Sequence, residues 1–193
     1  DGVRVGGSAD IKQLLPGMQS FHPTFLLAVP RVFEKVYNSA QQKAVADGKG
    51  SIFDTAAQVA IDYSKALDEG GPGIILKVKH AVFDKLVYGK LRDAMGGQMR
   101  WSVSGGAPLG SRLGHFFRGI NVTILEGYGL TETSAATTVN RPKALRIGSV
   151  GQPLPGAKVK VAADGELMLG GDQIFVGYWN NPAATALAFS DGW

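Results

Sequence analysis

Apolar positions recur along the first half of the chain in runs and at helical spacing, which predicts one strand followed by three helices. Residues 24–29 form a continuous apolar run that ends at a proline, as is typical of a strand buried on both faces. From 31 to 46 apolar residues recur at helical spacing. A second helix is predicted over 52–67, before the glycine-rich break at 70–73, and a third over 74–95.

The pattern then returns to strand and helix in alternation. Residues 99–104 are predicted to form a strand, and a glycine turn and a helix that ends near Arg118 follow it. Pro108 suits the first turn of that helix, where a missing N–H group costs nothing. Residues 122–125 read as a short buried strand. This alternation indicates an α/β fold, in which ligands usually bind at strand ends.

The last quarter of the chain has a different pattern. Two segments, 157–161 and 166–169, have either alternating or continuous apolar residues, and an Ala-Asp-Gly turn lies between them. This pattern predicts a hairpin. Asn181 and Pro182 together suit the N-cap and first turn of a short helix. We therefore expect an α/β lobe over residues 1–141 and a small β-rich lobe over residues 142–193, truncated at its C-terminal end.

Composition and charge narrow the class of protein. The chain is 45% hydrophobic and 19% charged, as in an ordinary globular protein, and its net charge of +4 is too small for a nucleic-acid partner. It has no cysteine, which excludes disulfides and Cys-based metal sites and is compatible with a reducing compartment. No apolar run approaches the length of about 20 residues that a membrane span needs. We expect a cytoplasmic protein.

The predicted helix over 74–95 carries several lysines, including Lys77, Lys79 and Lys85. Such a helix could lie at the periphery of an anionic membrane, on its inner face, or attract acidic ligands. Charged residues on an amphipathic helix more often form its solvated face, and that interpretation is favoured here. The two ends of the sequence, without an initiator Met before Asp1 or a tail after Trp193, lead us to expect a piece of a longer protein.

The clearest candidate chemistry follows the strand at 122–125. Gly127 and Gly129 are predicted to break the strand, next to the aromatic ring of Tyr128, the hydroxyl of Thr131 and the carboxylate of Glu132. A ring can stack on a base, a hydroxyl can bind a phosphate, and a carboxylate can hold Mg²⁺. The three together suggest a nucleotide site. An ordinary strand exit with a solvated glutamate remains the alternative.

A second nucleotide class also fits part of the pattern. Gly105, Ala107 and Gly110 follow a predicted strand and open a helix, and Glu126 ends the next strand. This spacing is similar to a dinucleotide-binding loop with an acidic residue on the ribose, as in an NAD-dependent oxidoreductase. Against it, the helix is short, and Glu126 leads directly into the aromatic and acidic turn described above.

That turn carries a family resemblance. The sequence Gly-Tyr-Gly-Leu-Thr-Glu at 127–132 resembles the Tyr-Gly-x-Thr-Glu signature of the adenylate-forming enzymes. The Ser-Gly-Gly-Ala-Pro-Leu turn at 104–109 and the Pro-Arg-Val-Phe-Glu-Lys phrase at 30–35 are similar to the same family, most of all to bacterial long-chain fatty-acid–CoA ligases. The phrases at 165–167 and 177–179 match a further motif, interpreted here as structural, with Tyr178 and Trp179 as buried anchors.

The resemblance implies a fold, a reaction and its cofactors. The fold would be part of the adenylate-forming N-terminal domain, an α/β lobe followed by a distorted β-barrel lobe. A long-chain fatty acid and ATP would give acyl-adenylate and pyrophosphate, and coenzyme A would then displace AMP. The implied cofactors are ATP or AMP and Mg²⁺, with coenzyme A as a substrate.

The resemblance also implies roles for particular residues. Two groups of residues would contact adenosine from opposite sides. One group is Gly105, Gly106, Ala107 and Pro108, and the other is Glu126, Gly127 and Tyr128. Tyr128 would stack on the adenine ring, while Gly129 and Leu130 would lie near the acyl group. Thr131 would bind the α-phosphate and Glu132 would hold Mg²⁺, so these two are the catalytic candidates.

Several features of the family are missing from these 193 residues. They contain no phosphate-binding loop followed by Pro-Lys-Gly, no Thr-Gly-Asp motif for the ribose, and no C-terminal lid with its catalytic lysine. We therefore expect the isolated chain to be inactive and at most a weak nucleotide binder. The open alternatives are another adenylate former, such as an aryl-CoA ligase or a peptide-synthetase domain, an NAD-binding oxidoreductase, and a non-catalytic interaction domain. The sequence does not determine the chain length of the fatty acid or the oligomeric state.

Overall fold

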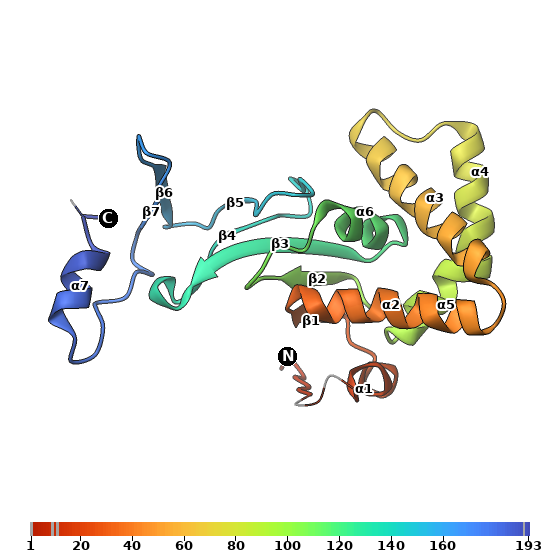
Figure 1. Cartoon of the computed structure of the whole chain (residues 1–193), viewed down its shortest axis with the longest axis horizontal. Coiled ribbons are helices and arrows are strands. Elements are labelled where there is room, and N and C mark those ends of the chain that lie inside the picture. Colours follow the sequence, from red (N-terminus) through yellow and green to blue (C-terminus); the bar gives the residue numbers. More distant parts are fainter. Residues whose placement is uncertain (1, 9, 11, 191) are drawn as a thin grey trace. The chain divides into compact units, whose positions relative to one another are not determined.

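The computed structural model describes residues 2–8, 10, 12–190 and 192–193, and it has a mixed α/β architecture (Figure 1). The chain divides into two compact units, Asp1–Ile124 and Leu125–Trp193. The boundary expected near residue 142 falls inside the second unit, and that division into lobes stays a prediction. Asp1, which the sequence analysis names as the first residue, lies outside the described residues.

The first unit is mainly helical around two parallel strands. Its elements, in order, are α1 (Leu14–Phe21), β1 (Phe25–Ala28), α2 (Pro30–Ala46), α3 (Gly50–Asp68), α4 (Ile74–Phe83), the π-helical segment η1 (Asp84–Tyr88), α5 (Gly89–Ala94), β2 (Trp101–Ser104) and α6 (Ser111–Gly119). β1 pairs with β2 in parallel. The helices predicted over 31–46 and 52–67 and the strand predicted over 99–104 are confirmed.

The core of the first unit is formed by helices α2, α3 and α6. Phe33 and Phe117 meet edge to face with ring centroids 5.6 Å apart, and Tyr37 and Phe116 meet in the same way at 4.8 Å. Phe53 of α3 joins the same cluster. Phe33 and Tyr37 are four residues apart on α2, so one face of that helix presents both rings to the other helices. Edge-to-face aromatic packing of this kind contributes beyond the apolar area that it buries.

β1 is a strand as predicted, but the expectation that both its faces are buried is wrong. Leu26 and Ala28 pack against the core, whereas Phe25 and Leu27 are exposed. Side chains alternate between the two faces of a strand, so only every second residue of the apolar run can reach this core. A continuous apolar run therefore did not distinguish a strand covered on one face from a strand covered on both.

Two helix predictions are also corrected. The helix after β2 begins at Ser111, so Pro108 lies in the preceding loop and not in the first turn. Gly110 has φ +83°, a left-handed conformation that keeps it and the residues before it out of the helix. The third predicted helix, over 74–95, is not one regular α-helix, because the π-helical turn η1 separates α4 from α5.

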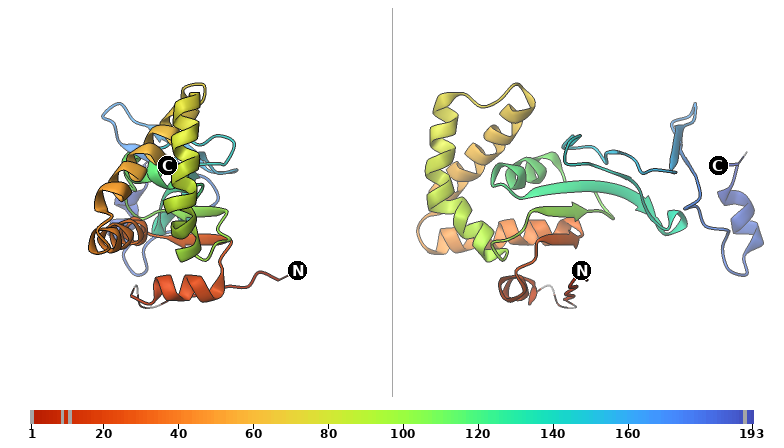
Figure 2. Two further views of the ribbon diagram at one scale, coloured as in Figure 1. Left: turned by 90° about the vertical axis from the view of Figure 1, so that its right-hand side faces the viewer. Right: turned by 180° about the vertical axis from the view of Figure 1, so that it is seen from behind.

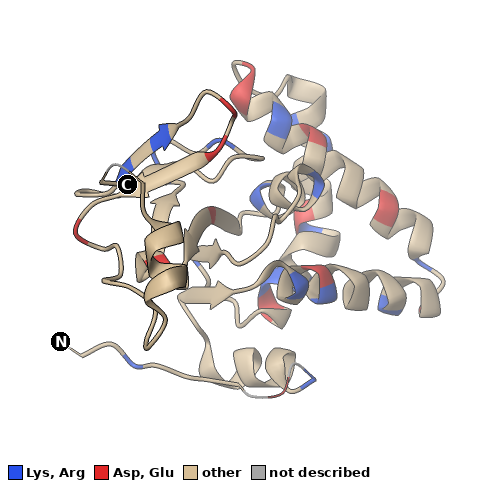
Figure 3. Cartoon of the chain, turned by 60° about the vertical axis from the view of Figure 1, so that its left-hand side comes forward, with Lys and Arg blue, Asp and Glu red and all other residues tan. Residues whose placement is uncertain are grey.

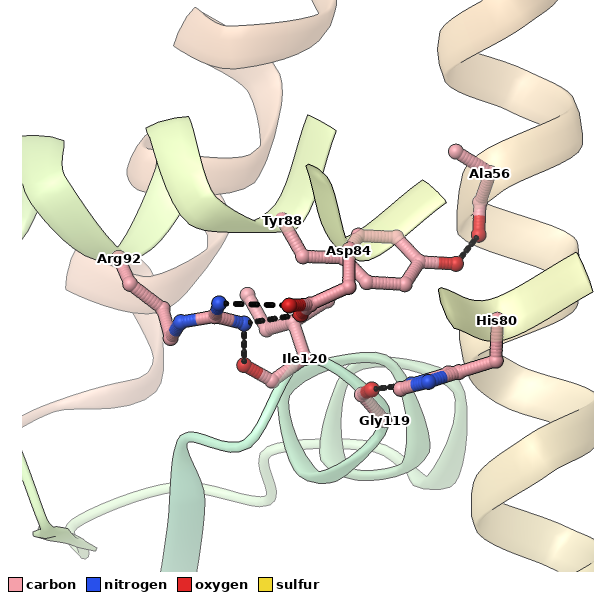
Figure 4. Close-up of polar contacts among 7 residues, drawn as sticks. All are labelled: Ala56, His80, Asp84, Tyr88, Arg92, Gly119 and Ile120. Atoms are coloured by element: carbon pink, nitrogen blue, oxygen red, sulfur yellow. Dashed lines mark hydrogen bonds and ion pairs between the residues drawn. The ribbon is translucent and has the colours of Figure 1, made fainter. Parts of the chain in front are cut away.

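A network of polar contacts fixes α4, η1 and α5 to the rest of the first unit (Figure 4). A ring nitrogen of His80, Nε2, lies 2.6 Å from the carbonyl oxygen of Gly119. Arg92 donates to both carboxylate oxygens of Asp84, at 2.6 and 3.2 Å, and to the carbonyl oxygen of Ile120 at 3.2 Å.

The hydrogen bond from Arg92 lowers the pKa of Asp84 below its usual value. An acid whose pKa is depressed by folding contributes stability above its unfolded pKa. That contribution is lost as the pH falls through the folded pKa. This pair therefore helps to hold η1 at neutral pH and ceases to do so in acid.

Tyr88 provides a buried hydrogen bond whose removal can be measured. Its side chain is fully buried, its hydroxyl donates to the carbonyl oxygen of Ala56 at 2.7 Å, and burial raises the pKa of that hydroxyl. We expect Tyr88→Phe to lower the free energy of unfolding by about 1–2 kcal/mol, because one buried hydrogen bond is lost. Urea titration should show a lower midpoint at an unchanged slope.

Tyr63→Phe is the matched control for that variant. Tyr63 stacks on His80 with centroids 3.8 Å apart, and among the described residues its hydroxyl has no hydrogen bond to lose. It should shift the midpoint by much less than Tyr88→Phe. Equal midpoints for Tyr88→Phe and the unmodified protein would show that the Ala56 contact carries no stability.

The described residues of the second unit form strands and the helix α7. Its elements are the larger part of β3 (Thr123–Leu130), the 3₁₀ turn η2 (Thr131–Thr133), β4 (Ala135–Val139), β5 (Gln152–Pro153), β6 (Lys158–Val161), β7 (Leu167–Gly170) and α7 (Pro182–Ala188). β3, β4 and β5 pair antiparallel in that order, and β6 and β7 form a separate hairpin. The predicted hairpin and the helix capped by Asn181, whose side chain accepts from the Ala184 N–H, are confirmed.

Candidate functional site

The two glycines of the signature sequence lie inside a strand and do not break it. β3 runs through Gly127 and Gly129 to Leu130, with a register shift between Tyr128 and Gly129. A Cβ atom at Gly129 would overlap the carbonyl group of Ala135 on β4, and one at Gly127 would stand 3.0 Å from the carbonyl oxygen of Thr138. These positions therefore require glycine because β4 approaches closely, and the prediction of a strand break was wrong.

A buried threonine hydroxyl closes the turn that follows β3. The Thr133 hydroxyl accepts from the Leu130 N–H at 2.9 Å and lies within hydrogen-bond distance of the carbonyl oxygens of Leu130 and Ala135. Ser134 and Ala135 both have positive φ, which reverses the chain sharply into β4. The turn leaves Thr131 exposed and Glu132 partly exposed at its tip. Thr133 could not be predicted as a site residue from the sequence, because its role depends on this reversal.

Glu132 is held by two contacts from a distant loop. The hydroxyl of Tyr178 donates to Oε1 of Glu132 at 2.8 Å, and the Phe175 N–H donates to the Glu132 carbonyl oxygen at 2.8 Å. The Tyr178 hydrogen bond, more than any other contact, lowers the pKa of the Glu132 carboxyl below its usual range. The same bond raises the pKa of Tyr178. Glu132 is therefore an oriented, ionised carboxylate at neutral pH.

Tyr178 and Trp179 do not act as the buried anchors that the sequence predicted. Trp179 is 91% exposed and Tyr178 is 41% exposed. Gly177 and Asn180 both have positive φ, so this segment is a tight surface loop, and the Tyr178 N–H donates to the Thr185 hydroxyl at 2.9 Å. Tyr178 is a candidate site residue that sequence reasoning assigned to the core. No local signal connects it to a glutamate 46 residues earlier.

Removing the Tyr178 hydroxyl tests the coupling between these two side chains. In Tyr178→Phe we expect the pKa of Glu132 to rise toward its ordinary value, because the hydrogen bond that favours the ionised form is lost. NMR titration of the glutamate carboxyl carbons reads this directly, with Tyr128→Phe as the control. A Glu132 titration midpoint that stays in place in Tyr178→Phe would contradict the contact.

The other predicted site residues of the second unit follow one another along β3. Glu126 is buried, and its carbonyl oxygen accepts from the backbone N–H of Asn140 at 2.9 Å. Gly127, Tyr128 and Gly129 are half-buried. The residues from Glu126 to Glu132 thus lie on β3 and the turn that follows it, and their roles in binding a nucleotide stay a prediction.

The other residues predicted to contact adenosine belong to the first unit. Gly105, Gly106, Ala107 and Pro108 form the loop between β2 and α6. Gly105 is half-buried and the other three are exposed, and Gly106 has φ +83°. A loop of this kind offers backbone groups rather than side chains to a ligand.

Asn140 is a second residue that the sequence analysis missed. It is buried, its amide nitrogen donates to the carbonyl oxygens of Glu126 and Ser149, and its amide oxygen accepts from the Arg146 N–H at 2.9 Å. It therefore ties the loop between β4 and β5 to the strand that carries the candidate site. A Cβ at Gly151 would overlap the backbone at Asn140, so this loop is tightly packed.

The donor groups fit a magnesium ion that a substrate helps to hold. Among the residues that the structure describes, no group of three or more His, Cys, Asp or Glu side chains could hold a metal by itself. Mg²⁺ commonly binds to one or two carboxylates together with substrate phosphates. The ionised carboxylate of Glu132 is suited to be the protein ligand in such a site.

Among the residues that the structure describes, no helix is long and apolar enough to cross a membrane.

Comparison with known proteins decides the family. The AMP-binding enzyme family matches residues 3–179. The chain belongs to this family. Membership implies a protein that uses ATP or AMP, and it gives no support to the NAD-dependent oxidoreductase considered from the glycine loop.

Curated relatives of this member of the AMP-binding enzyme family include fatty-acid ligases. It is 58% identical over 191 residues to the long-chain-fatty-acid–CoA ligase FadD15 of Mycobacterium bovis, covering 99% of this chain and 32% of the relative. It is 34% identical over 205 residues to the long chain acyl-CoA synthetase 4 of Arabidopsis thaliana, covering 95% of this chain and 29% of the relative. The chain thus spans about a third of the length of such relatives.

Solved structures show the fold of the family. The anthranilate CoA ligase AuaEII, in complex with anthranoyl-AMP, matches with TM-score 0.61 at 18% identity, over 97% of this chain and 29% of that one. The N-terminal domain of FACL13 from Mycobacterium tuberculosis matches with TM-score 0.56 at 20% identity, over 95% of this chain and 37% of that one. The predicted α/β fold of an adenylate-forming N-terminal domain is confirmed.

Proposed function

We propose that this chain is part of an ATP-dependent long-chain fatty-acid–CoA ligase. The whole protein would join a long-chain fatty acid to ATP, giving acyl-adenylate and pyrophosphate. The coenzyme A thiol would then displace AMP to give the thioester. The observation that carries the proposal is the 58% identity, over 99% of this chain, to a protein named as a long-chain-fatty-acid–CoA ligase.

The turn after β3 would handle the phosphate that reacts. Glu132 would contribute its ionised carboxylate to Mg²⁺, which when bound neutralises charge that develops on the phosphate oxygens. Thr131 would donate its exposed hydroxyl to the α-phosphate. Tyr178 would hold the Glu132 carboxylate in one orientation through the bond of 2.8 Å. The support for these roles is the geometry of the turn together with the signature sequence.

Other residues would bind the adenosine and the acyl group. Tyr128 is half-buried on β3 and would stack its ring on adenine. The backbone of the loop that contains Gly105, Gly106, Ala107 and Pro108 would contact the adenine edge, as would the strand residues Glu126 and Gly127. Gly129 and Leu130 would lie near the acyl group, to which the exposed side chain of Leu130 would offer an apolar contact.

The 193 residues alone are proposed to be inactive. They contain no phosphate loop followed by Pro-Lys-Gly to hold the β- and γ-phosphates. With few groups to bind the triphosphate, the transition state would lack much of its electrostatic stabilisation. We expect no acyl-adenylate from the isolated chain and at most weak nucleotide binding.

The proposal is tested on the natural full-length protein. It is incubated with ATP, Mg²⁺, coenzyme A and one acid at a time, from octanoate to stearate and with benzoate, and acyl-CoA and AMP are measured by mass spectrometry. We expect thioesters of the long acids, formed with equal amounts of AMP. Thioester formation from benzoate but from no fatty acid would contradict the proposal and favour an aryl-CoA ligase.

A further inference from the structure

Helix α4 exposes a stripe of large apolar side chains to solvent. The stripe consists of Ile74, Ile75, Val78, Val82 and Leu86, which are between 50% and 81% exposed. Four of them follow at intervals of four residues, which keeps them on one face through α4 and into η1. Single exposed apolar residues are ordinary on protein surfaces, but a continuous stripe indicates an interaction surface.

The orientation of this stripe is fixed by the opposite face of the same helix. His80 is buried and bonded to the Gly119 carbonyl oxygen, and it stacks on Tyr63 of α3. Phe83 and Val87 pack against the core of the first unit. α3 and α4 run side by side in two views (Figure 1, Figure 2). Rotating α4 to bury the stripe would expose His80 and break these contacts.

Neighbouring helices of the same unit have ordinary polar surfaces. The exposed face of α3 includes Asp54, Thr55, Gln58, Asp62 and Lys65, and that of α2 includes Arg31, Glu34, Asn38 and Gln42. Acidic and basic positions are interspersed along the helical part of the chain (Figure 3). A continuous apolar solvent face therefore distinguishes α4 from the neighbouring helices α2 and α3.

The unpaired charges beside the stripe are lysines. Lys77, Lys79, Lys85 and Lys90 are exposed, and α4 itself contains no acidic residue. Within the described part of the chain, none of these lysines forms an ion pair. The nearby Asp84 is already engaged by Arg92. The stripe is thus flanked by free positive charges that attract a negatively charged partner.

We propose that the α4 surface, formed by this apolar stripe and its lysines, docks on an anionic phospholipid membrane. A helix with an apolar face and a lysine-rich polar face lies in the membrane interface, with its apolar side chains at the boundary of headgroups and acyl chains. The lysine stems can follow the apolar surface while their ammonium groups reach the lipid phosphates. A second copy of the chain fits less well, because its own lysines would meet these.

The proposal does not depend on the ligase assignment, and vesicle binding tests it. The natural full-length protein is sedimented with phosphatidylcholine vesicles, with and without phosphatidylglycerol, at low and high salt. We expect binding to the anionic vesicles only, weakened by salt. Val78→Asp/Val82→Asp and, separately, Lys77→Gln/Lys79→Gln should each weaken it by about tenfold or more.

Matched controls carry the same change of charge on other helices. Ile52→Asp/Thr55→Asp alters exposed positions of α3, and Lys43→Gln/Lys65→Gln alters exposed lysines of α2 and α3. Both controls should bind vesicles nearly as the unmodified protein does. Because the lysine variants change only exposed side chains, they remain informative if the aspartate pair fails to fold.

Three results would overturn the proposal. The first is an unmodified protein that binds neither kind of vesicle. The second is α4 variants that bind as well as their controls. The third is an α4 variant that converts a dimer into monomers in light scattering while vesicle binding persists, which would assign the surface to a second copy instead.

Discussion

Glu132→Gln in the natural full-length protein should lower the turnover number for acyl-adenylate formation by about 10²–10³, the usual cost of removing one group that stabilises charge in a transition state. Glutamine keeps the size of the side chain and an oxygen that can accept from Tyr178, so the turn should keep its shape. The variant removes the negative charge proposed to hold Mg²⁺. The measurement is the initial rate of acyl-adenylate formation over a range of Mg²⁺ concentrations.

The control for this variant is Glu69→Gln. Glu69 is exposed at the end of α3, and changing it removes one carboxylate without touching the candidate site. It should leave the rate unchanged. If Glu132→Gln had the same rate and the same Mg²⁺ dependence as Glu69→Gln, the role proposed for Glu132 would be wrong. This conclusion would hold even if the protein is a fatty-acid–CoA ligase.

Gly119→Ala should destabilise the first unit by about 3 kcal/mol, at the upper end of the usual cost of overpacking a core. A Cβ atom at Gly119 would overlap the backbone of Ala60, where α6 packs directly on α3. Backbone cannot rotate away as a flexible side chain can, so the two helices must separate. That separation would also disturb the contact of His80 with the Gly119 carbonyl oxygen.

Thermal unfolding followed by circular dichroism measures this loss, expected as a fall in Tm of about 6–12 °C for a protein of this size. Gly17→Ala is the matched control, because Gly17 is also helical but nothing lies within 4 Å of the Cβ that would be added. Alanine there should be neutral or slightly stabilising. Equal Tm values for the two variants would contradict the close approach of α3 and α6.

The fold could be predicted where one periodicity extended over many residues. The helices α2 and α3 were predictable because their apolar residues recur at helical spacing over four or more turns. The hairpin of β6 and β7 was predictable from its turn residues. In each case the signal is local, so the sequence contains it without any knowledge of distant neighbours.

Glycine and aromatic residues were harder to interpret because their roles depend on neighbours that are distant in the chain. A glycine suits a sharp turn or the close approach of another strand, and only the position of Ala135 shows that Gly129 serves the second purpose. Likewise, an aromatic residue after glycine is read as core until Tyr178 is seen to contact Glu132. Contacts between residues so far apart in the chain produce no periodic pattern in the sequence.

The candidate site was predicted mainly from a short sequence motif and less from the composition and spacing of the residues. Composition and spacing left a nucleotide site, a dinucleotide loop and a plain strand exit open. The resemblance at 127–132 favoured the family that the comparison then showed. Thr133 and Asn140, which hold the site's backbone, carry no motif and were found only from their hydrogen bonds.

The most direct test of the account is ATP–pyrophosphate exchange on the natural full-length protein, with palmitate and Mg²⁺ and without coenzyme A. Exchange reports reversible acyl-adenylate formation, the step assigned to the turn that carries Thr131 and Glu132. We expect exchange that requires both the acid and Mg²⁺ and whose rate falls by about 10²–10³ in Glu132→Gln. A folded protein that catalyses no exchange with any fatty acid would contradict it.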